Sequence, residues 1–275
     1  MKILILGGTS EAKLLAQQLI NIDVDVIYSI AGLVRQPTLD CKIISGGFSQ
    51  YGGLTKYLAT EKIAYLLDVT HPFAAKMSRQ AVRSTADVNI PYCAFVRPQW
   101  QPQAGDDWAL LANETQLMHE LALAVNTGSK NIFYTNGQIN RQLAIELDGI
   151  AELNEAFGPA QYIIRSAKET ELPQYSQWVQ AIGPFNINDE KALLEKYQVD
   201  LIVCKNSGGE ATKAKLEAAR TLGIRVLMLQ RPHIELSGGV QVNSKLSSEF
   251  ERKPNKIFNS LTECFEEIKN SGYNK

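Results

Sequence analysis

The sequence has neither an excess of charge of one sign nor a cluster of histidines, two features that would point to particular binding partners. Lys and Arg number 28 against 29 Asp and Glu, which gives a formal net charge of −1 over 275 residues. We therefore expect no basic surface for nucleic acid or for an anionic membrane. The three histidines, His71, His119 and His233, are far apart in the chain and show no metal-ligand spacing. Any anion site must be local, and no bound metal is expected.

The four cysteines contain no CxxC pair. Cys41, Cys93, Cys204 and Cys264 each lie in or beside an apolar segment, which predicts reduced core cysteines. The apolar run at the N-terminus is too short for a signal peptide, and Glu11 follows it closely. No apolar run reaches the length of a membrane span. We therefore expect a cytoplasmic protein.

Several common catalytic patterns are missing too. No Tyr is followed four residues later by Lys, so the pair typical of short-chain dehydrogenases is absent. Residues 47–51, GFSQY, depart from the GxSxG nucleophile elbow at the last position. Neither a paired-carboxylate pattern nor HExxH occurs.

What the chain does have is a regular alternation of short β-branched runs and helical patterns. The expected strands are 2–6, 25–30, 42–45, 64–69, 92–96, 131–137, 161–166, 178–184, 199–205 and 225–232. Continuous apolar strands with helices between them predict parallel sheets covered on both faces. We expect an α/β fold of two Rossmann-like open parallel-sheet domains with a cleft between them.

The polar segment 97–108, with its prolines and Gly105, is expected to cross between the two halves. In the tail, Ser260 and Glu263 form a capping-box pattern that predicts a helix through about Lys269. The expected divisions are a first α/β domain at 1–112, a second α/β domain at 113–236 and a polar tail with a C-terminal helix at 237–275.

The turn at the end of the first strand is the first candidate site, although GxGxxG is absent from it. The strand ends in Gly7 and Gly8, where the backbone can turn without Cβ clashes, and Thr9 and Ser10 open a helical pattern. Backbone N–H groups and the helix dipole at such a start favour a phosphate. The alternative is that Ser10 only caps the helix and no ligand binds.

The second strand bears on the choice of nucleotide. Folds that bind NAD usually place an acid at its end, for the ribose 2′-hydroxyl. Here residues 28–32 read YSIAG, without an acid, and Arg35 follows. Ser29 and Arg35 could hydrogen-bond a 2′-phosphate, so NADP fits better than NAD. The alternative is that Arg35 is only a solvated loop residue.

Other polar and glycine clusters follow the third and fourth strands, where open α/β sheets bind ligands. The cofactor-binding candidates there are Gly46, Gly47, Phe48 and Thr70. His71 precedes Pro72, which holds it out of the helical region. Its ring could face the ligand crevice, or it could serve the structure alone.

A second anion-type turn ends a buried strand in the second half. It reads Lys205-Asn206-Ser207-Gly208-Gly209, and it is no Walker loop because the GK[ST] order is missing. Thr135 ends another strand of that half. Lys205 could instead pair with a nearby acid such as Glu210 and only stabilise the helix start. Two such turns would suit a large, negatively charged molecule.

Taken in order, the segments ILGGTSEA, SGGFSQYGGL, DVTHPFA, KNSGGEATKAKLEAA and VLMLQRP resemble the precorrin-6A reductase family of corrin biosynthesis. The similarity runs from about residue 2 to 232. It implies hydride transfer from NADPH to a ring-contracted tetrapyrrole, giving the 6B form of precorrin-6A or of its cobalt-loaded counterpart. Two departures concern GGFGG, here GGFSQ, and an Arg expected directly after Ala31-Gly32, where Leu33 stands.

This resemblance assigns roles to the candidate residues. The pyrophosphate of NADPH would lie on Gly7–Ser10, with the nicotinamide toward Thr70 and His71, and His71 is the candidate proton donor. The substrate carboxylates would meet Lys205, Asn206, the Ser207–Gly209 amides, Thr135, Arg97 and Arg231. The alternatives are a dinucleotide-sensing module without catalysis and another NADP oxidoreductase on the same fold. The oligomeric state is left open.

Overall fold

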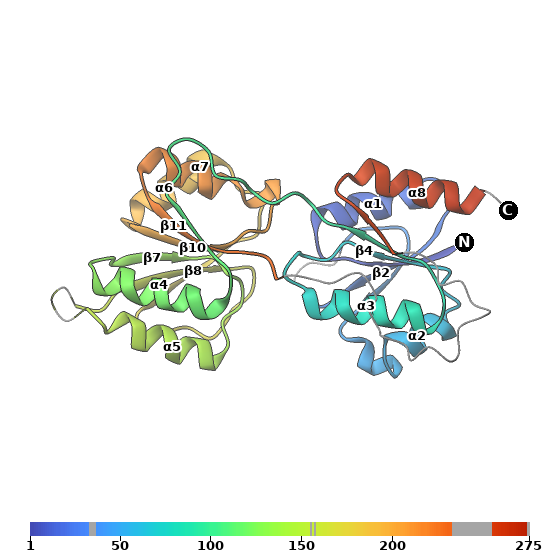
Figure 1. Cartoon of the computed structure of the whole chain (residues 1–275), viewed down its shortest axis with the longest axis horizontal. Coiled ribbons are helices and arrows are strands. Elements are labelled where there is room, and N and C mark those ends of the chain that lie inside the picture. Colours follow the sequence, from blue (N-terminus) through green and yellow to red (C-terminus); the bar gives the residue numbers. More distant parts are fainter. Residues whose placement is uncertain (33–36, 155, 157, 233–254, 274–275) are drawn as a thin grey trace, which may run out of the picture. The chain divides into compact units, whose positions relative to one another are not determined.

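The computed structural model describes residues 1–32, 37–154, 156, 158–232 and 255–273. They divide into two compact units. Unit 1 combines residues 1–98 with the described part of 233–275, and unit 2 is residues 99–232. Each unit is an open parallel sheet with helices on both faces (Figure 1), so the expected α/β class is confirmed.

Unit 1 is built on a sheet with the order β12-β5-β4-β1-β2-β3. Its described strands are β1 (Lys2–Leu6), β2 (Asp25–Ile30), β3 (Lys42–Ser45), β4 (Tyr65–Asp68), β5 (Tyr92–Phe95) and β12 (Lys256–Phe258). Its described helices are α1 (Ser10–Ile20), the short 3-10 helix η1 (Phe48–Tyr51), α2 (Leu54–Thr60), α3 (Ala75–Asp87) and α8 (Leu261–Tyr273). One face packs on α1 and α8, and the other packs on α2 and α3. The strand order reverses between β1 and β4, so ligands are expected at the carboxyl ends of these two strands.

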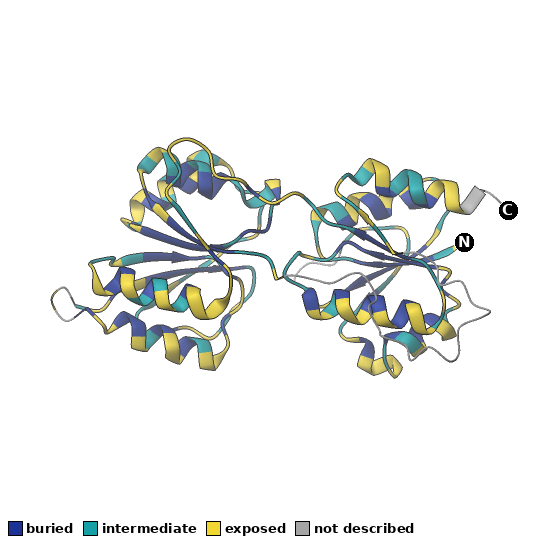
Figure 2. Cartoon of the chain, in the orientation of Figure 1, coloured by how far each residue is buried: buried dark blue, intermediate teal, exposed yellow. Residues whose placement is uncertain are grey.

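Unit 2 repeats this plan, with the sheet order β6-β11-β10-β7-β8-β9. Its described strands are β6 (Trp108–Leu111), β7 (Asn131–Tyr134), β8 (Gln161–Ser166), β9 (Ser176–Gln180), β10 (Leu201–Lys205) and β11 (Arg225–Leu229). Its described helices are α4 (Glu114–Asn126), α5 (Arg141–Ala151), α6 (Ile187–Lys196), the 3-10 helix η2 (Glu210–Thr212) and α7 (Ala214–Leu222). The central strands are buried under these helices (Figure 2). Here the strand order reverses between β7 and β10.

Two of the expected domain boundaries, the one after residue 112 and the one before residue 237, differ from the division seen in the structure. A boundary at 112 assigned β6 to the first domain, but β6 pairs in parallel with β11 of unit 2. The tail is not a separate segment either, because β12 pairs with β5 and α8 packs Cys264 and Ile268 into the core of unit 1. Strand pairing explains both differences. The sixth strand of each sheet, β6 in unit 2 and β12 in unit 1, lies in a segment that the sequence pattern assigned to another part of the protein.

Local sequence signals explain where the helices begin. Asn113, Asn140 and Asn186 each accept a hydrogen bond from the backbone N–H three residues later, which is a typical N-cap for α4, α5 and α6. The capping box predicted in the tail is confirmed in part, since the Ser260 hydroxyl accepts from Glu263 N at 3.4 Å. Helix α8 then continues past the predicted end at Lys269, to Tyr273.

The four cysteines are free thiols, and only Cys41 is not fully buried. This confirms the core positions expected for Cys93, Cys204 and Cys264. In the part of the chain that the structure describes, no helix has the length and apolar character needed to cross a membrane.

Candidate functional site

The turn between β1 and α1 requires glycine at two positions for two different reasons. Gly8 has a φ of +106°, in the region that glycine alone adopts easily. A Cβ on Gly7 would lie 2.3 Å from Cζ of Tyr28, so the Tyr28 ring of β2 packs directly against the turn. The Tyr28 hydroxyl also accepts a hydrogen bond from Gly8 N at 3.2 Å. By contrast, nothing lies within 4 Å of a Cβ built on Gly8, so this side of the turn is open.

Thr9 joins this turn to the loop after β4. Its hydroxyl accepts from Ala12 N at 3.1 Å, which caps α1, and donates to the Val69 carbonyl at 2.8 Å. The alternative in which Ser10 caps the helix is therefore wrong: the cap is Thr9, and the Ser10 hydroxyl donates to Glu11 instead. The two loops are held together at the point where the strand order reverses.

The loop after β4 is organised by a buried carboxylate. Asp68 Oδ1 accepts from Thr70 N at 3.0 Å and from the Thr70 hydroxyl at 2.7 Å, and Oδ2 accepts from the Tyr92 hydroxyl at 2.9 Å. Burial and the neighbouring Asp68 charge raise the pKa of Tyr92 far above its ordinary value, so this phenol stays a donor. Three donors satisfy a carboxylate that is 3% exposed and fix the position of Thr70.

His71 lies on the exposed part of the same loop. Its Nδ1 accepts from Phe73 N at 3.3 Å, which leaves the proton of the neutral ring on Nε2. The ring lies tilted against that of Phe73, with centroids 5.8 Å apart. This geometry is compatible with a proton-donating Nε2.

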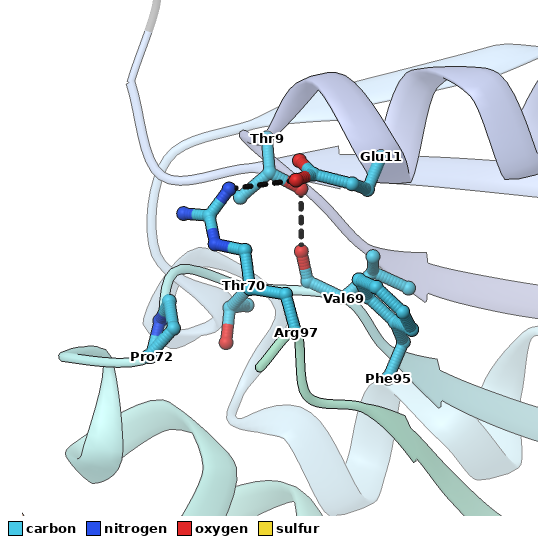
Figure 3. Close-up of a pocket in the computed structure, with 7 residues that line it drawn as sticks. All are labelled: Thr9, Glu11, Val69, Thr70, Pro72, Phe95 and Arg97. Carbon is cyan, nitrogen blue, oxygen red and sulfur yellow. Dashed lines mark hydrogen bonds and ion pairs between the residues drawn. The ribbon is translucent and has the colours of Figure 1, made fainter. Parts of the chain in front are cut away.

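A small pocket lies between these loops in unit 1 (Figure 3). It is lined by Thr9, Glu11, Val69, Thr70, Pro72, Phe95 and Arg97. Arg97, which follows β5, points toward the start of α1 and binds Glu11 through Nη1 and Oε1 at 2.8 Å. Glu11 and Phe95 were missed by sequence reasoning. The position of Phe95 was readable from the pattern, since it ends β5, whereas the contact of Glu11 with Arg97 depends on how the fold brings α1 and the end of β5 together.

The remaining cofactor candidates lie at the ends of β2 and β3. The Ser29 side chain is buried at the end of β2, and its carbonyl accepts from Gly7 N at 2.8 Å. Gly46 N donates to the Ile30 carbonyl. Gly47 precedes Phe48, which is a core residue against Tyr57. Arg35 lies outside the described residues.

The carboxyl ends of β7 and β10 form a cationic edge in unit 2. Lys205 Nζ donates to the Asn136 carbonyl at 2.8 Å, and the Thr135 hydroxyl donates to the Val203 carbonyl. Glu210 was the alternative partner predicted for Lys205, and its Oε2 lies 3.9 Å from Lys213 Nζ. Burial lowers the pKa of Lys205 below its ordinary value.

Arg231 and Asn206 shape the turn that follows β10. The guanidinium of Arg231 donates to the carbonyls of Asn206 and Ser207, at 2.9 and 3.0 Å. The Asn206 side chain accepts from Trp100 N at 2.9 Å and donates to the Trp100 carbonyl at 3.1 Å. Asn206 is 2% exposed, so its amide anchors the crossing segment in unit 2. Ser207, Gly208 and Gly209 form the turn itself.

The structure thus groups the predicted residues by unit. It brings Gly7, Gly8, Thr9, Ser10 and Thr70 together in unit 1, and Thr135, Lys205, Ser207 and Arg231 together in unit 2. Arg97 is the exception, because it was predicted with the substrate residues and lies instead in the pocket of unit 1, at the start of α1.

The fold and these turns define a class: a Rossmann-like α/β protein with a glycine turn at the point where the strand order of its first sheet reverses. Comparison with known proteins identifies the family. Residues 2–252 match the family model described as precorrin-6x reductase CbiJ/CobK, and the chain belongs to this family.

Named relatives agree with this placement. The chain is 37% identical over 238 residues to a precorrin-6A reductase of Rhodococcus erythropolis, covering 84% of this chain and 89% of the relative. It is 27% identical to a cobalt-precorrin-6A reductase of Priestia megaterium, covering 85% and 91%. A solved structure of the CobK precorrin-6A reductase matches with a TM-score of 0.79 at 29% identity, covering 99% of this chain and 97% of that one.

Proposed function

We propose that this protein is a reductase of the corrin pathway that transfers a hydride from NADPH to precorrin-6A and gives precorrin-6B. The reaction is an oxidoreduction of a CH–CH bond, with NADP and a reduced tetrapyrrole as products. The observation that carries the proposal is family membership over residues 2–252 together with the open glycine turn at the switch point of unit 1.

The metal-free substrate is the better supported of the two. Five relatives named precorrin-6A reductase are 33–37% identical to this chain, whereas those named cobalt-precorrin-6A reductase are 24–28% identical. Both groups align over similar shares of the chain, so the difference lies in sequence and not in coverage.

The residues of unit 1 fit a reduced dinucleotide. Gly8 leaves open space beside the turn, and the start of α1 presents backbone N–H groups for a pyrophosphate. When bound, NADPH supplies the hydride. Asp68 holds Thr70, and Thr9 holds Val69, so the wall of the pocket where the nicotinamide would lie is rigid before binding. His71 would deliver the proton through Nε2, and solvent is the alternative donor.

NADPH is favoured over NADH by the end of β2. An acid there would bind the ribose diol of NADH and repel a 2′-phosphate, but this position holds Ser29. We expect Ser29→Asp to move the ratio of kcat/KM for NADPH over NADH at least tenfold toward NADH, because a charge–charge penalty there is about 1–3 kcal/mol. Ser29→Asn is the matched uncharged control. An unaltered ratio would place the 2′ group elsewhere.

The cationic edge of unit 2 would receive the substrate carboxylates. Lys205 supplies a positive charge, and the backbone of Gly208 and Gly209 supplies amides, because the Ser207 N–H already donates to the Lys205 carbonyl at 2.8 Å. Arg231 keeps the turn carbonyls engaged. Thr135 extends this edge at the end of β7. These groups bind and orient a polyanionic macrocycle, and placement is the main requirement for hydride transfer to a conjugated acceptor.

The decisive experiment is anaerobic turnover with purified protein. NADPH absorbance is followed with precorrin-6A, with its cobalt form and with neither. We expect NADPH consumption with the metal-free tetrapyrrole, accompanied by a change in the pigment spectrum. NADPH binding without consumption in any arm would instead indicate a dinucleotide-sensing module, and preference for the cobalt form would reverse the substrate assignment.

A further inference from the structure

Glu11 sits at a position where its carboxylate interacts with the groups that an incoming phosphate would need. It is the second residue of α1, directly after the glycine turn. Its carboxylate accepts from the Ser10 hydroxyl at 3.0 Å and from Arg97 Nη1 at 2.8 Å. Burial alone would raise the pKa of Glu11, but a hydrogen bond from its own backbone N–H and the Arg97 guanidinium bring the pKa below its ordinary value. The carboxylate is therefore ionised at neutral pH.

These three donors are a backbone N–H at a helix start, a hydroxyl and a guanidinium. The same set binds a pyrophosphate at the first turn of a dinucleotide fold. Arg97 and Glu11 have side chains only 12% and 19% exposed, so their pairing is shielded from solvent and is stronger than a surface ion pair. Figure 3 shows the guanidinium reaching from the end of β5 across the pocket to the start of α1.

We propose that Glu11 is an internal anion that competes with the pyrophosphate of the cofactor for Arg97 and for the start of α1. In this view Arg97 serves the cofactor and not the tetrapyrrole, and Glu11 sets how tightly the cofactor is held. The inference rests on the proposed function, since it assumes a dinucleotide at the β1–α1 turn.

Two substitutions at this pair should act in opposite directions. Glu11→Gln keeps the shape of the side chain but removes its charge, so the Kd for NADPH should fall about three- to tenfold. Arg97→Gln removes the cation, so the Kd should rise about ten- to a hundredfold, the loss of one charge-assisted contact. Glu11→Gln should also lower Tm slightly, because an acid in the first turn stabilises a helix.

A matched control tests whether the effect is local. Lys42 Nζ lies 2.7 Å from Glu61 Oε1. Both residues lie near the amino ends of the strands of the same sheet, whereas Glu11 lies near the carboxyl ends. Glu61→Gln makes the same chemical change and the same change in net charge. It should leave the Kd for NADPH unaltered.

The measurements are NADPH binding by fluorescence titration, competition by adenosine 2′-monophosphate, and Tm by circular dichroism. The monophosphate has no phosphate at its 5′ position, so both variants at the pair should bind it like the wild-type protein. Weaker or unchanged NADPH binding by Glu11→Gln, in a variant that melts cooperatively, would make the pair a structural ion pair and overturn the inference. Wild-type protein that binds no NADPH would overturn the proposed function, and this inference with it.

Discussion

In unit 1, β1 passes through residues 7–9 directly into α1, whereas in unit 2 the corresponding strand β7 is followed by residues 135–140 before α5 begins. The strands beside β1 and β7 also end differently: β4 ends in the buried acid Asp68, whereas β10 ends in Lys205. The strand order around each switch point is nevertheless the same. One topology therefore ends in two different turns, and under the proposed function the turns, not the sheet, decide which ligand each unit binds.

The short turn in unit 1 puts a helix start beside the strand end, where a dinucleotide phosphate needs it. The longer loop in unit 2 moves the helix start away from the strand end, so the proposed anion contacts there are the Lys205 side chain and the amides of the turn after β10. Under the proposed function, this difference suits a compact pyrophosphate in unit 1 and scattered carboxylates in unit 2.

The largest expected effect comes from filling the close contact in the unit 1 turn. Gly7→Ala would place a methyl group 2.3 Å from the ring of Tyr28, a side chain that is buried in the core. We expect a loss of about 3 kcal/mol in the free energy of unfolding, the upper part of the range for overpacking, and loss of NADPH binding. Urea unfolding and NADPH titration measure both.

Gly149→Ala in α5 is the control for that variant. Nothing lies within 4 Å of a Cβ built on Gly149. It should fold and bind NADPH like the wild-type protein. A Gly7→Ala protein of normal stability would mean that Tyr28 does not pack against the turn as described.

The next effect concerns the buried acid that distinguishes β4 from β10. Asp68→Ala leaves the Thr70 and Tyr92 donors without their acceptor, and the free energy of unfolding should fall by about 2–3 kcal/mol. Because Thr70 loses its support, kcat should fall while the KM for the tetrapyrrole changes little. Asp68→Asn keeps an oxygen for Thr70 and should lose less on both measures. Equal kcat in all three proteins would deny Asp68 a positioning role.

The sequence predicted the strands well because continuous apolar runs between helical patterns admit few other arrangements. It missed β6 and β12, since each is a short edge strand whose partner is distant in the chain, β11 and β5 respectively. It found the glycine turn, because Gly7 and Gly8 are local features. It missed the role of Thr9 as cap and of Glu11 beside Arg97, because both depend on which loops the fold brings together. The place of Arg97 in the pocket of unit 1 was missed for the same reason, and its predicted contact with the substrate stays a prediction.

In unit 2, Lys205→Met should separate the two ligands. Losing one charge-assisted hydrogen bond costs about 1.5–3 kcal/mol, so the KM for the tetrapyrrole should rise about ten- to a hundredfold with the KM for NADPH unchanged. Tm should fall as well, since Lys205 also holds the Asn136 carbonyl. A lower Tm with a normal tetrapyrrole KM would show that Lys205 only supports the turn.

The smallest expected effect is a pH dependence of tetrapyrrole binding and of folding stability that arises from Lys205 in unit 2. Burial lowers the pKa of Lys205, and the nearby Glu114 only partly opposes this, so its ammonium is lost before pH reaches the ordinary lysine value of 10.5. As pH rises through that lowered pKa, the KM for the tetrapyrrole should increase a few-fold. The contribution of Lys205 to the free energy of unfolding changes in the opposite direction: it becomes more favourable as substrate binding weakens. Between the two pKa values the unfolded chain binds more protons than the folded one, so this contribution makes the folded state more stable as pH rises. Steady-state kinetics and urea unfolding in one buffer series measure both trends, and Lys205→Met should abolish them. Identical pH profiles for the variant and the wild-type protein would mean that another group titrates at the substrate edge.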